Sequence, residues 1–208
     1  LGLHEFLNLC EELGIRPLII VNVRAGAQNA ADLVEYILGP STSAQGAIRM
    51  ANGRTAPWDA PYFEIGNEPP DESAYDYGYD SSALEDMGSD YADRAGNIIT
   101  AMNGKASDLG KTIFLGGISE TAFQLSDWLS GTSLVEIIRM IAKWNSQVLG
   151  GTFLSKANFI SGHFYSSRFY HTNTPGGAFI PGDHYKYLMA GGTVLKRTIN
   201  EKIKPLTG

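Results

Sequence analysis

The chain has 208 residues, 43% of them hydrophobic, and its 22 acidic and 16 basic side chains give a net charge of −6. This acidic balance, without a cluster of Lys and Arg, argues against a nucleic-acid partner, because phosphate binding needs clustered positive charge. No apolar run is long enough to cross a bilayer, and a single cysteine, Cys10, excludes an intrachain disulfide and a cysteine-based metal cluster.

The chain opens at Leu1 without an initiator Met, a charged leader or a cleavage site. We therefore expect it to be an excerpt of a longer, soluble protein. Its compartment, cytoplasmic or secreted, stays open, as does homo-oligomerisation of the full-length protein.

Two patterns of apolar residues alternate along the chain. Helical spacing predicts helices whose stripes are Leu3–Leu13, Leu33–Leu38, Tyr91–Met102 and Leu134–Val148, with a last helix near Asp183–Ile203. Short continuous apolar runs predict four strands, at Pro17–Asn22, Tyr62–Gly66, Thr112–Gly117 and Ala157–His163. The first run is typical of a strand buried on both faces, and residues 40–61 are expected to be rich in turns.

Strand and helix in continuous alternation predict an α/β fold of parallel strands joined by crossover helices. A complete TIM (β/α)8 barrel needs roughly 250 residues, and four strands alone would leave two apolar edges unpaired. We therefore expect residues 1–208 to form a single partial catalytic TIM-barrel domain. The alternative is an open doubly wound sheet, which predicts a glycine-rich phosphate loop, and Val21–Gly26 lacks the required glycine spacing.

The strongest motif is Tyr62–Pro69, which reads Tyr-Phe-Glu-Ile-Gly-Asn-Glu-Pro. Residues two apart in a strand share a face. If Phe63 and Ile65 face the outer helices, Glu64 and Glu68 therefore point into the barrel. Glu68 would then lie at the carboxyl end of the strand, where active sites of this fold are built.

Such a carboxyl group suits hydrolysis of a glycosidic bond. That reaction needs a carboxylic acid to protonate the departing oxygen and a second carboxylate opposite it. Glu68 fits the first role if burial or a neighbouring negative charge raises its pKa, and Asn67 could donate a hydrogen bond to a sugar hydroxyl. On pattern alone an ordinary surface turn remains an equal alternative, whereas Glu64 better fits a buried polar network.

Several ordered pieces of residues 2–68 match one enzyme family at the same spacing. They are Glu5–Leu7, Cys10–Gly14, Pro17–Ile19, Val21–Asn22, Val34–Tyr36, Ala51–Gly53 and Glu64–Glu68. The chain resembles the central barrel region of glycoside hydrolase family 51, the α-L-arabinofuranosidases. Beyond residue 90 the resemblance is looser and rests on Tyr91–Ala92, Trp144–Asn145 and Phe159–Tyr165.

The resemblance implies which residues do the chemistry. Glu68 would be the acid/base at the end of the fourth barrel strand, with Asn67 contacting the sugar. Asn22, which ends the third strand, would line the same pocket, and His163 and Tyr165, which end the sixth, would lie close to the nucleophile. The family's nucleophile is a Glu ending a seventh strand that we do not find here, so the chain would supply about strands three to six.

The implied function is that of a retaining glycoside hydrolase that removes arabinose side chains from plant polysaccharides. Its partner would be an oligo- or polysaccharide, and no cofactor is expected. The loops at residues 23–28 and 69–72 depart from the family pattern and leave the exact sugar open. The alternatives are another barrel glycosidase of the same clan, such as a β-xylosidase or endoglucanase, and a carbohydrate-binding barrel without turnover.

Two further groups of residues invite other interpretations. Glu120 closes the third predicted strand and could be mistaken for the second carboxylate, but its place on an adjacent strand favours a hydrogen-bonding role. His163, His171, Asp183 and His184 invite a zinc hypothesis. Their spacing matches no helical ligand motif, so we expect no metal site.

Overall fold

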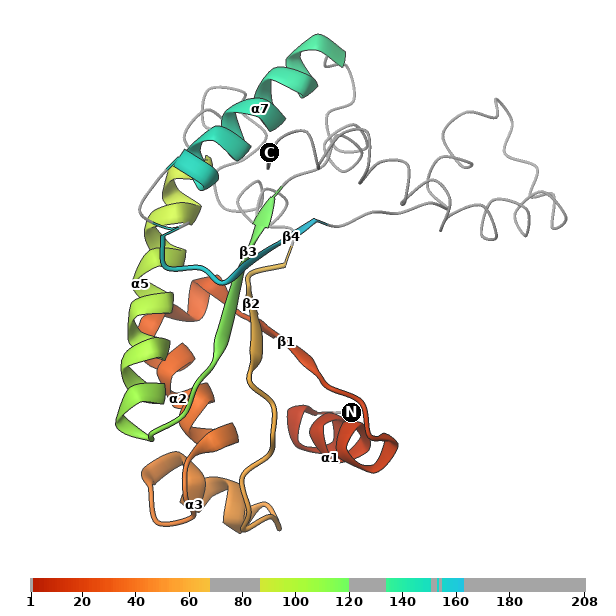
Figure 1. Cartoon of the computed structure of the whole chain (residues 1–208), viewed down its shortest axis with the longest axis vertical. Helices are drawn as coiled ribbons and strands as arrows, with labels where there is room; N and C mark the ends of the chain where they lie inside the picture. The colour runs from red at the N-terminus through yellow and green to blue at the C-terminus, as the bar shows by residue number, and fades with distance from the viewer. Residues whose placement is uncertain (1, 68–86, 120–133, 151–152, 154, 163–208) are drawn as a thin grey trace, which may run out of the picture. The chain divides into compact units, whose positions relative to one another are not determined.

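The computed structural model describes residues 2–67, 87–119, 134–150, 153 and 155–162, all of which belong to one compact unit, Leu1–Gly162. Four strands form one parallel sheet in the order β1 to β4 (Figure 1). The strands are β1 (Leu18–Val21), β2 (Tyr62–Ile65), β3 (Phe114–Ser119) and β4 (Phe159–Gly162).

The helix α1 (Leu3–Leu13) precedes β1, and further helices lie between the successive strands. They are the short 3-10 helix η1 (Val23–Ala25), α2 (Gly26–Leu38), α3 (Ala44–Ala51), α5 (Met87–Asp108) and α7 (Leu134–Gly150). Figure 1 shows α2, α5 and α7 along one side of the sheet. A doubly wound sheet reverses its strand order at a switch point, and the four described strands show no reversal. The strand order agrees with the predicted incomplete (β/α)8 barrel, and the sheet is not closed within the described residues.

The core lies between the sheet and these helices. Strand residues at alternate positions pack against the helical stripes, among them Ile19, Val21, Phe63, Ile65 and Leu115. All five predicted stripe residues of α5 are buried: Tyr91, Ala95, Ile98, Ile99 and Met102. This packing explains why helical spacing located α5 correctly, since a 3.6-residue repeat places one face of the helix against the sheet.

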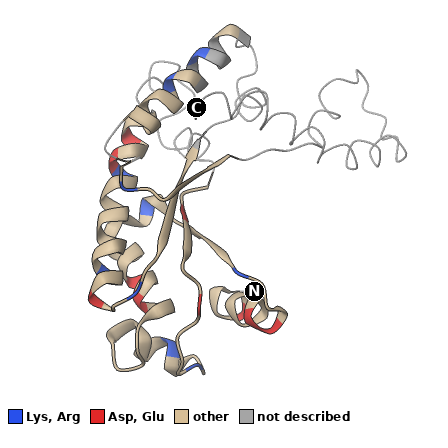
Figure 2. Ribbon diagram, viewed as in Figure 1, with Lys and Arg blue, Asp and Glu red and all other residues tan. Residues whose placement is uncertain are grey.

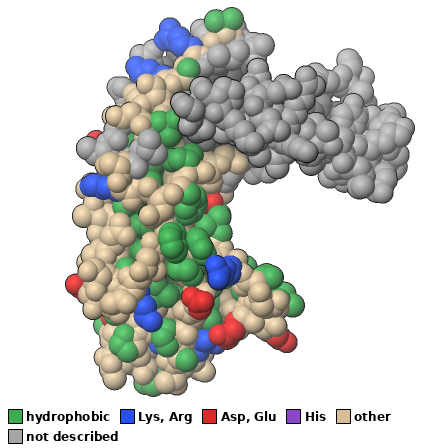
Figure 3. Space-filling model, viewed as in Figure 1, with side chains coloured by type: hydrophobic (Ala, Val, Ile, Leu, Met, Phe, Trp, Pro, Cys, Tyr) green, Lys and Arg blue, Asp and Glu red, His purple; other side chains and the backbone are tan. Residues whose placement is uncertain are grey.

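The other face of the sheet is open at β1 and β3. Leu18, Ile20 and Phe114 are 46%, 50% and 38% exposed, and apolar side chains gather in the middle of the surface seen in Figure 3. The Tyr62 and Phe114 rings stack on each other with centroids 5.1 Å apart. The prediction that both faces of β1 are buried is wrong for the described residues, because α2, α5 and α7 cover only one of them.

The helix α3 lies where only turns were expected. Its N-cap is Ser43, whose Oγ accepts a hydrogen bond from the Gly46 amide at 3.2 Å. Gly46 faces the Pro40 carbonyl so closely that a Cβ at this position would overlap the oxygen. The glycine therefore allows α3 to pack against the turn that follows α2.

We expect Gly46→Ala to lower the free energy of unfolding by about 1–3 kcal/mol, because the added methyl group overpacks a rigid backbone contact. The matched control is Gly104→Ala in α5, where nothing lies within 4 Å of the added carbon. This change should raise stability by about 0.5–1 kcal/mol, as alanine usually does in a helix. Urea unfolding of both variants measures the difference, and an equal response of the two would contradict this packing.

Glu35 on α2 anchors two neighbouring helices. It is 7% exposed, and its carboxylate accepts hydrogen bonds from Lys105 Nζ of α5 at 2.7 Å and from the Gln45 amide of α3 at 3.3 Å. The hydrogen bond from Lys105 lowers the pKa of the Glu35 carboxyl against its burial. Because the folded pKa is below the unfolded one, the pair stabilises the fold above the usual pKa of 4.5, and its contribution is lost as the pH falls further.

Replacing Lys105 with Met should therefore destabilise the protein in a pH-dependent way. We expect a loss of about 1.5–3 kcal/mol at pH 7, the usual size for a hydrogen bond to a charged group. The difference between the parent and the variant should shrink as the pH falls below 4.5. Lys111→Met, at an exposed position after α5, is the control and should stay within about 0.5 kcal/mol of the parent. Urea unfolding between pH 3 and pH 7 measures both, and a pH-independent loss would contradict the role of the pair.

Arg49 of α3 is the largest fully buried side chain in the described part of the chain. Its guanidinium donates to the carbonyl oxygens of Tyr36 at 2.7 Å, Gly39 at 2.8 Å, Thr55 at 2.9 Å and Arg54 at 3.3 Å. Two of these carbonyls belong to the end of α2, where helical carbonyls lack intrahelical partners. Arg49 thus joins the end of α2 to the segment that leads into β2.

Candidate active site

The carboxyl ends of the four parallel strands lie at one edge of the sheet. In the register, Val21 pairs with Ile65, Glu64 with Gly116, and Ser119 with Gly162. Parallel (β/α) enzymes build their active sites at this edge. Residues that follow these strand ends are therefore the candidates for chemistry.

On β2 the side chains alternate as predicted. Phe63 and Ile65 are fully buried against the helical layer, which places Tyr62 and Glu64 on the opposite face of the sheet. Glu64 is the only charged residue in the four described strands, and most other charges lie on helices and connections (Figure 2). The Glu64 side chain is 3% exposed and has at least one interaction partner. Both observations agree with the predicted buried polar network.

The extended backbone of β2 ends at Gly66, which has a φ of 90°. Its amide still donates to the Val21 carbonyl at 2.9 Å, so Gly66 remains bonded to β1. This φ lies in a region that side chains other than glycine rarely adopt. The strand's alternation therefore stops here, Asn67 is exposed, and the direction of the Glu68 side chain does not follow from the strand pattern.

Asn22 follows β1 directly, one residue after the pair of Val21 with Ile65. It is exposed, and its Oδ1 accepts a hydrogen bond from the Arg24 amide at 2.9 Å. This bond caps η1 and holds the side chain at the exit of the strand. Asn22 and Asn67 thus follow neighbouring strand ends, as the sequence predicted.

Tyr91 of α5 reaches the ends of two strands. Its hydroxyl donates to the Ile65 carbonyl of β2 at 2.7 Å and accepts from the Ile118 amide of β3 at 3.1 Å. Its ring stacks on Trp144 of α7, with centroids 5.2 Å apart. The apolar stripe predicted Tyr91 to be a core residue, but no sequence pattern predicted the hydrogen-bond partners of its hydroxyl.

Several predicted residues lie outside the described residues. Three of them are predicted site residues: Glu68, His163 and Tyr165. The others are Glu120, the remaining members of the zinc hypothesis (His171, Asp183 and His184) and the predicted last helix. In the sequence, Glu68 follows Asn67, Glu120 follows the last residue of β3, and His163 follows the last residue of β4. Their roles stay predictions.

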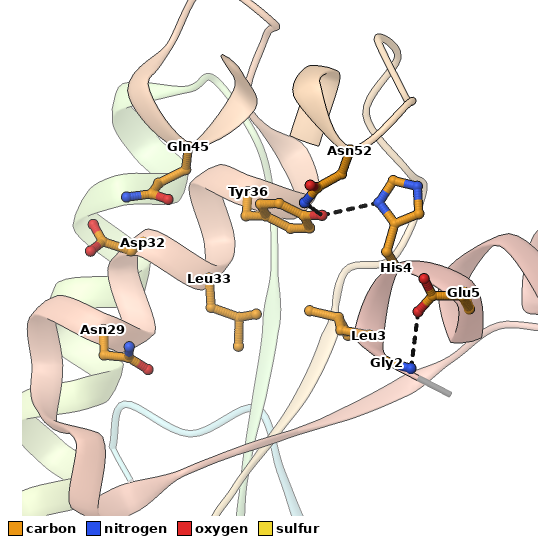
Figure 4. A pocket seen from close by; sticks show the side chains of 10 residues that line it. All are labelled: Gly2, Leu3, His4, Glu5, Asn29, Asp32, Leu33, Tyr36, Gln45 and Asn52. Atoms are coloured by element: carbon orange, nitrogen blue, oxygen red, sulfur yellow. Dashed lines mark hydrogen bonds between the residues drawn. The ribbon is translucent and has the colours of Figure 1, made fainter. Parts of the chain in front are cut away.

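A separate pocket of about 600 Å³ lies on the helical side, between α1, α2 and α3. Figure 4 shows His4 of α1 and Asn52 meeting the Tyr36 hydroxyl, which hydrogen-bonds His4 Nδ1 at 3.0 Å and Asn52 Nδ2 at 3.1 Å. None of its lining residues follows the carboxyl end of a strand. It is therefore distinct from the candidate active site.

A comparison with known protein families establishes the family of this chain. Residues 1–119, more than half of the chain, match the family described as the alpha-L-arabinofuranosidase 1 domain. The chain belongs to this family. The predicted resemblance to the α-L-arabinofuranosidases of glycoside hydrolase family 51 is thereby confirmed.

Two curated relatives show what share of a complete α-L-arabinofuranosidase this chain matches. It is 43% identical over 68 residues to an intracellular exo-alpha-L-arabinofuranosidase of Bacteroides ovatus, covering 32% of this chain and 13% of that protein. It is 35% identical over 85 residues to alpha-L-arabinofuranosidase A of Aspergillus niger, covering 33% and 14%. The chain thus matches only a small part of each relative's length.

A solved structure supports the fold. The family 51 alpha-L-arabinofuranosidase AbfB of Bifidobacterium longum superposes with a TM-score of 0.60 at 22% identity, covering 85% of this chain and 30% of that one. Among the described residues, no helix combines the length and the apolar character that a membrane crossing needs.

Proposed function

We propose that the complete protein is a retaining α-L-arabinofuranosidase in which Glu68 is the catalytic acid/base. One observation carries the proposal: in a chain of this family, Glu68 comes three residues after Ile65, the last residue of β2, which pairs with Val21 at the end of β1. The curated relatives named above are α-L-arabinofuranosidases, which supports arabinose-bearing polysaccharides as the substrate class.

The proposed reaction proceeds by double displacement. Glu68 protonates the departing glycosidic oxygen while a second carboxylate attacks the anomeric carbon, and the C–O bond to the leaving group breaks. Glu68, now ionised, takes a proton from water, whose oxygen displaces the carboxylate from the sugar.

The neighbouring polar residues would bind the sugar. Asn67 and Asn22, on adjacent strand exits, are proposed to hydrogen-bond its hydroxyl groups, and amide groups suit this because they both donate and accept. His163 and Tyr165, which follow β4, are proposed to lie near the second carboxylate. Residues 1–208 remain a proposed single, partial catalytic TIM-barrel domain.

Product analysis on the complete protein tests the proposal. Incubation with arabinan and with arabinoxylan should release L-arabinose, and NMR of the first product should show the same anomeric configuration as the substrate. Release of xylose or of glucan oligosaccharides instead would favour a β-xylosidase or an endoglucanase of the same clan. Saturable binding of arabinan without turnover would favour a carbohydrate-binding barrel, and either result would contradict the proposal.

A further inference from the structure

We infer that Tyr91 is a positioning residue for the acid/base carboxyl group, because its hydroxyl sets the spacing between the carboxyl ends of β2 and β3. The inference rests on the proposed role of Glu68. The Tyr91 hydroxyl lies where the regular hydrogen bonding between β2 and β3 ends.

The hydrogen bonds between β2 and β3 follow a fixed offset. The Phe114 amide donates to the Pro61 carbonyl at 2.8 Å, and a regular parallel ladder repeats such a bond every two residues along both strands. Two repeats further along, the bond would run from the Ile118 amide to the Ile65 carbonyl. In this protein the Tyr91 hydroxyl stands between these two groups and bonds to both.

The inserted hydroxyl separates the strands where the regular pairing stops. The paired residues end with Glu64 and Gly116, and beyond them Tyr91 replaces one direct bond by two. Both backbone groups remain satisfied, so the separation leaves no unpaired buried amide or carbonyl here. The tyrosine therefore acts as a spacer of fixed size at the active-site edge of the sheet.

The spacer is held rigidly. Tyr91 is 3% exposed, its ring packs between Trp144 and Phe153 with centroid distances of 5.2 and 5.8 Å, and the Trp144 indole N–H reaches the Ile118 carbonyl at 3.4 Å. A side chain confined in this way cannot change rotamer without disturbing the core. The position of the hydroxyl is thus set by α5 and α7 together.

The spacing bears directly on catalysis. The Ile65 carbonyl that Tyr91 binds is joined to Gly66, where the backbone leaves the strand toward Glu68. A shift of this carbonyl moves the starting point of that segment. A displacement of about 1 Å in a catalytic group can lower a rate about 100-fold, so a residue that fixes the exit should act on kcat.

The test is Tyr91→Phe in the complete protein, with Tyr36→Phe as the matched control. Each change removes a hydroxyl that bonds at least two protein groups, but Tyr36 bonds His4 and Asn52 in the helical layer. We expect Tyr91→Phe to lower kcat about 10- to 100-fold with KM changed less than about twofold. Measured as kcat/KM, which reports the first step, the loss should be larger for an alkyl arabinofuranoside, which needs protonation, than for a dinitrophenyl arabinofuranoside, which does not. Tyr36→Phe should keep kcat within about twofold of the parent.

Rates must be expressed per folded protein, with circular dichroism and thermal unfolding recorded for each variant. If Tyr91→Phe does not fold, Trp144→Phe replaces it and should show the same substrate dependence with a smaller loss, because it loosens the support of Tyr91. An unchanged kcat, or an equal loss on both substrates, would overturn the positioning role. If Glu68→Gln shows the substrate dependence and Tyr91→Phe does not, only this inference fails. If neither shows it, the proposed function fails as well.

Discussion

Glu68→Gln in the complete protein is expected to lower kcat/KM for an alkyl α-L-arabinofuranoside by about 100- to 10,000-fold, the usual contribution of a general acid. Glutamine keeps the shape of the side chain but has no proton to give to the leaving oxygen. A dinitrophenolate departs without protonation, so the first step on the corresponding aryl substrate should be much less affected. The dependence of rate on leaving-group acidity should therefore become steeper, and a set of aryl arabinofuranosides measures it.

Glu64→Gln is the matched control for this prediction, since it makes the same change four residues earlier in the chain, within β2. Glu64 is buried within β2, and its replacement should lower stability without steepening the leaving-group dependence. The parent should also lose activity at high pH as the acid ionises, and Glu68→Gln should lose that limb of the pH profile. An equal loss by Glu68→Gln on all leaving groups would contradict the acid/base assignment.

Arg49→Met is expected to lower the free energy of unfolding by about 3–5 kcal/mol, because several backbone carbonyls each lose a hydrogen bond from a charged group, worth about 1.5–3 kcal/mol. The change removes donors to four backbone carbonyls, three of them within 3.0 Å, and methionine supplies none. Carbonyls at the end of α2 and in the segment before β2 would lose these bonds in a buried place. The segment that leads into β2 should be affected first, because Arg49 binds it at both Arg54 and Thr55.

Arg16→Met is the control for Arg49, because Arg16 is an exposed arginine just before β1. It should stay within about 0.5 kcal/mol of the parent. Urea unfolding of both variants, with amide hydrogen exchange of residues 54–65, measures the effect. A loss of less than about 1 kcal/mol for Arg49→Met would show that these bonds are replaced by water.

The elements that sequence predicted best are those whose pattern reflects direct packing. The α5 stripe was found because each of its five residues contacts the core, and β2 was found because Phe63 and Ile65 alternate with polar neighbours. The helix α3 was missed because a short segment with Gly46 has weak helical propensity, and its stability comes from Ser43 and Arg49. Such tertiary contacts leave no periodic signal.

For the candidate site, the sequence predicted which residues follow the strand ends but not how their side chains are oriented. Asn22 and Asn67 follow strand ends in register, as parallel pairing requires. The alternation argument could not extend to Glu68, because Gly66 leaves the extended region with a φ of 90°. Tyr91 was marked as core by its spacing, but its bonds to Ile65 and Ile118 depend on how two strands diverge, which one sequence does not encode locally.

Azide rescue of Glu68→Ala in the complete protein is the most direct test of the central claim. With an activated aryl arabinofuranoside, the missing base slows hydrolysis of the covalent intermediate, and azide, which needs no general base, should restore the rate. The account predicts that the product is α-L-arabinofuranosyl azide, with the substrate's configuration. No rescue, or a β-configured azide, which would make Glu68 the nucleophile, would contradict it.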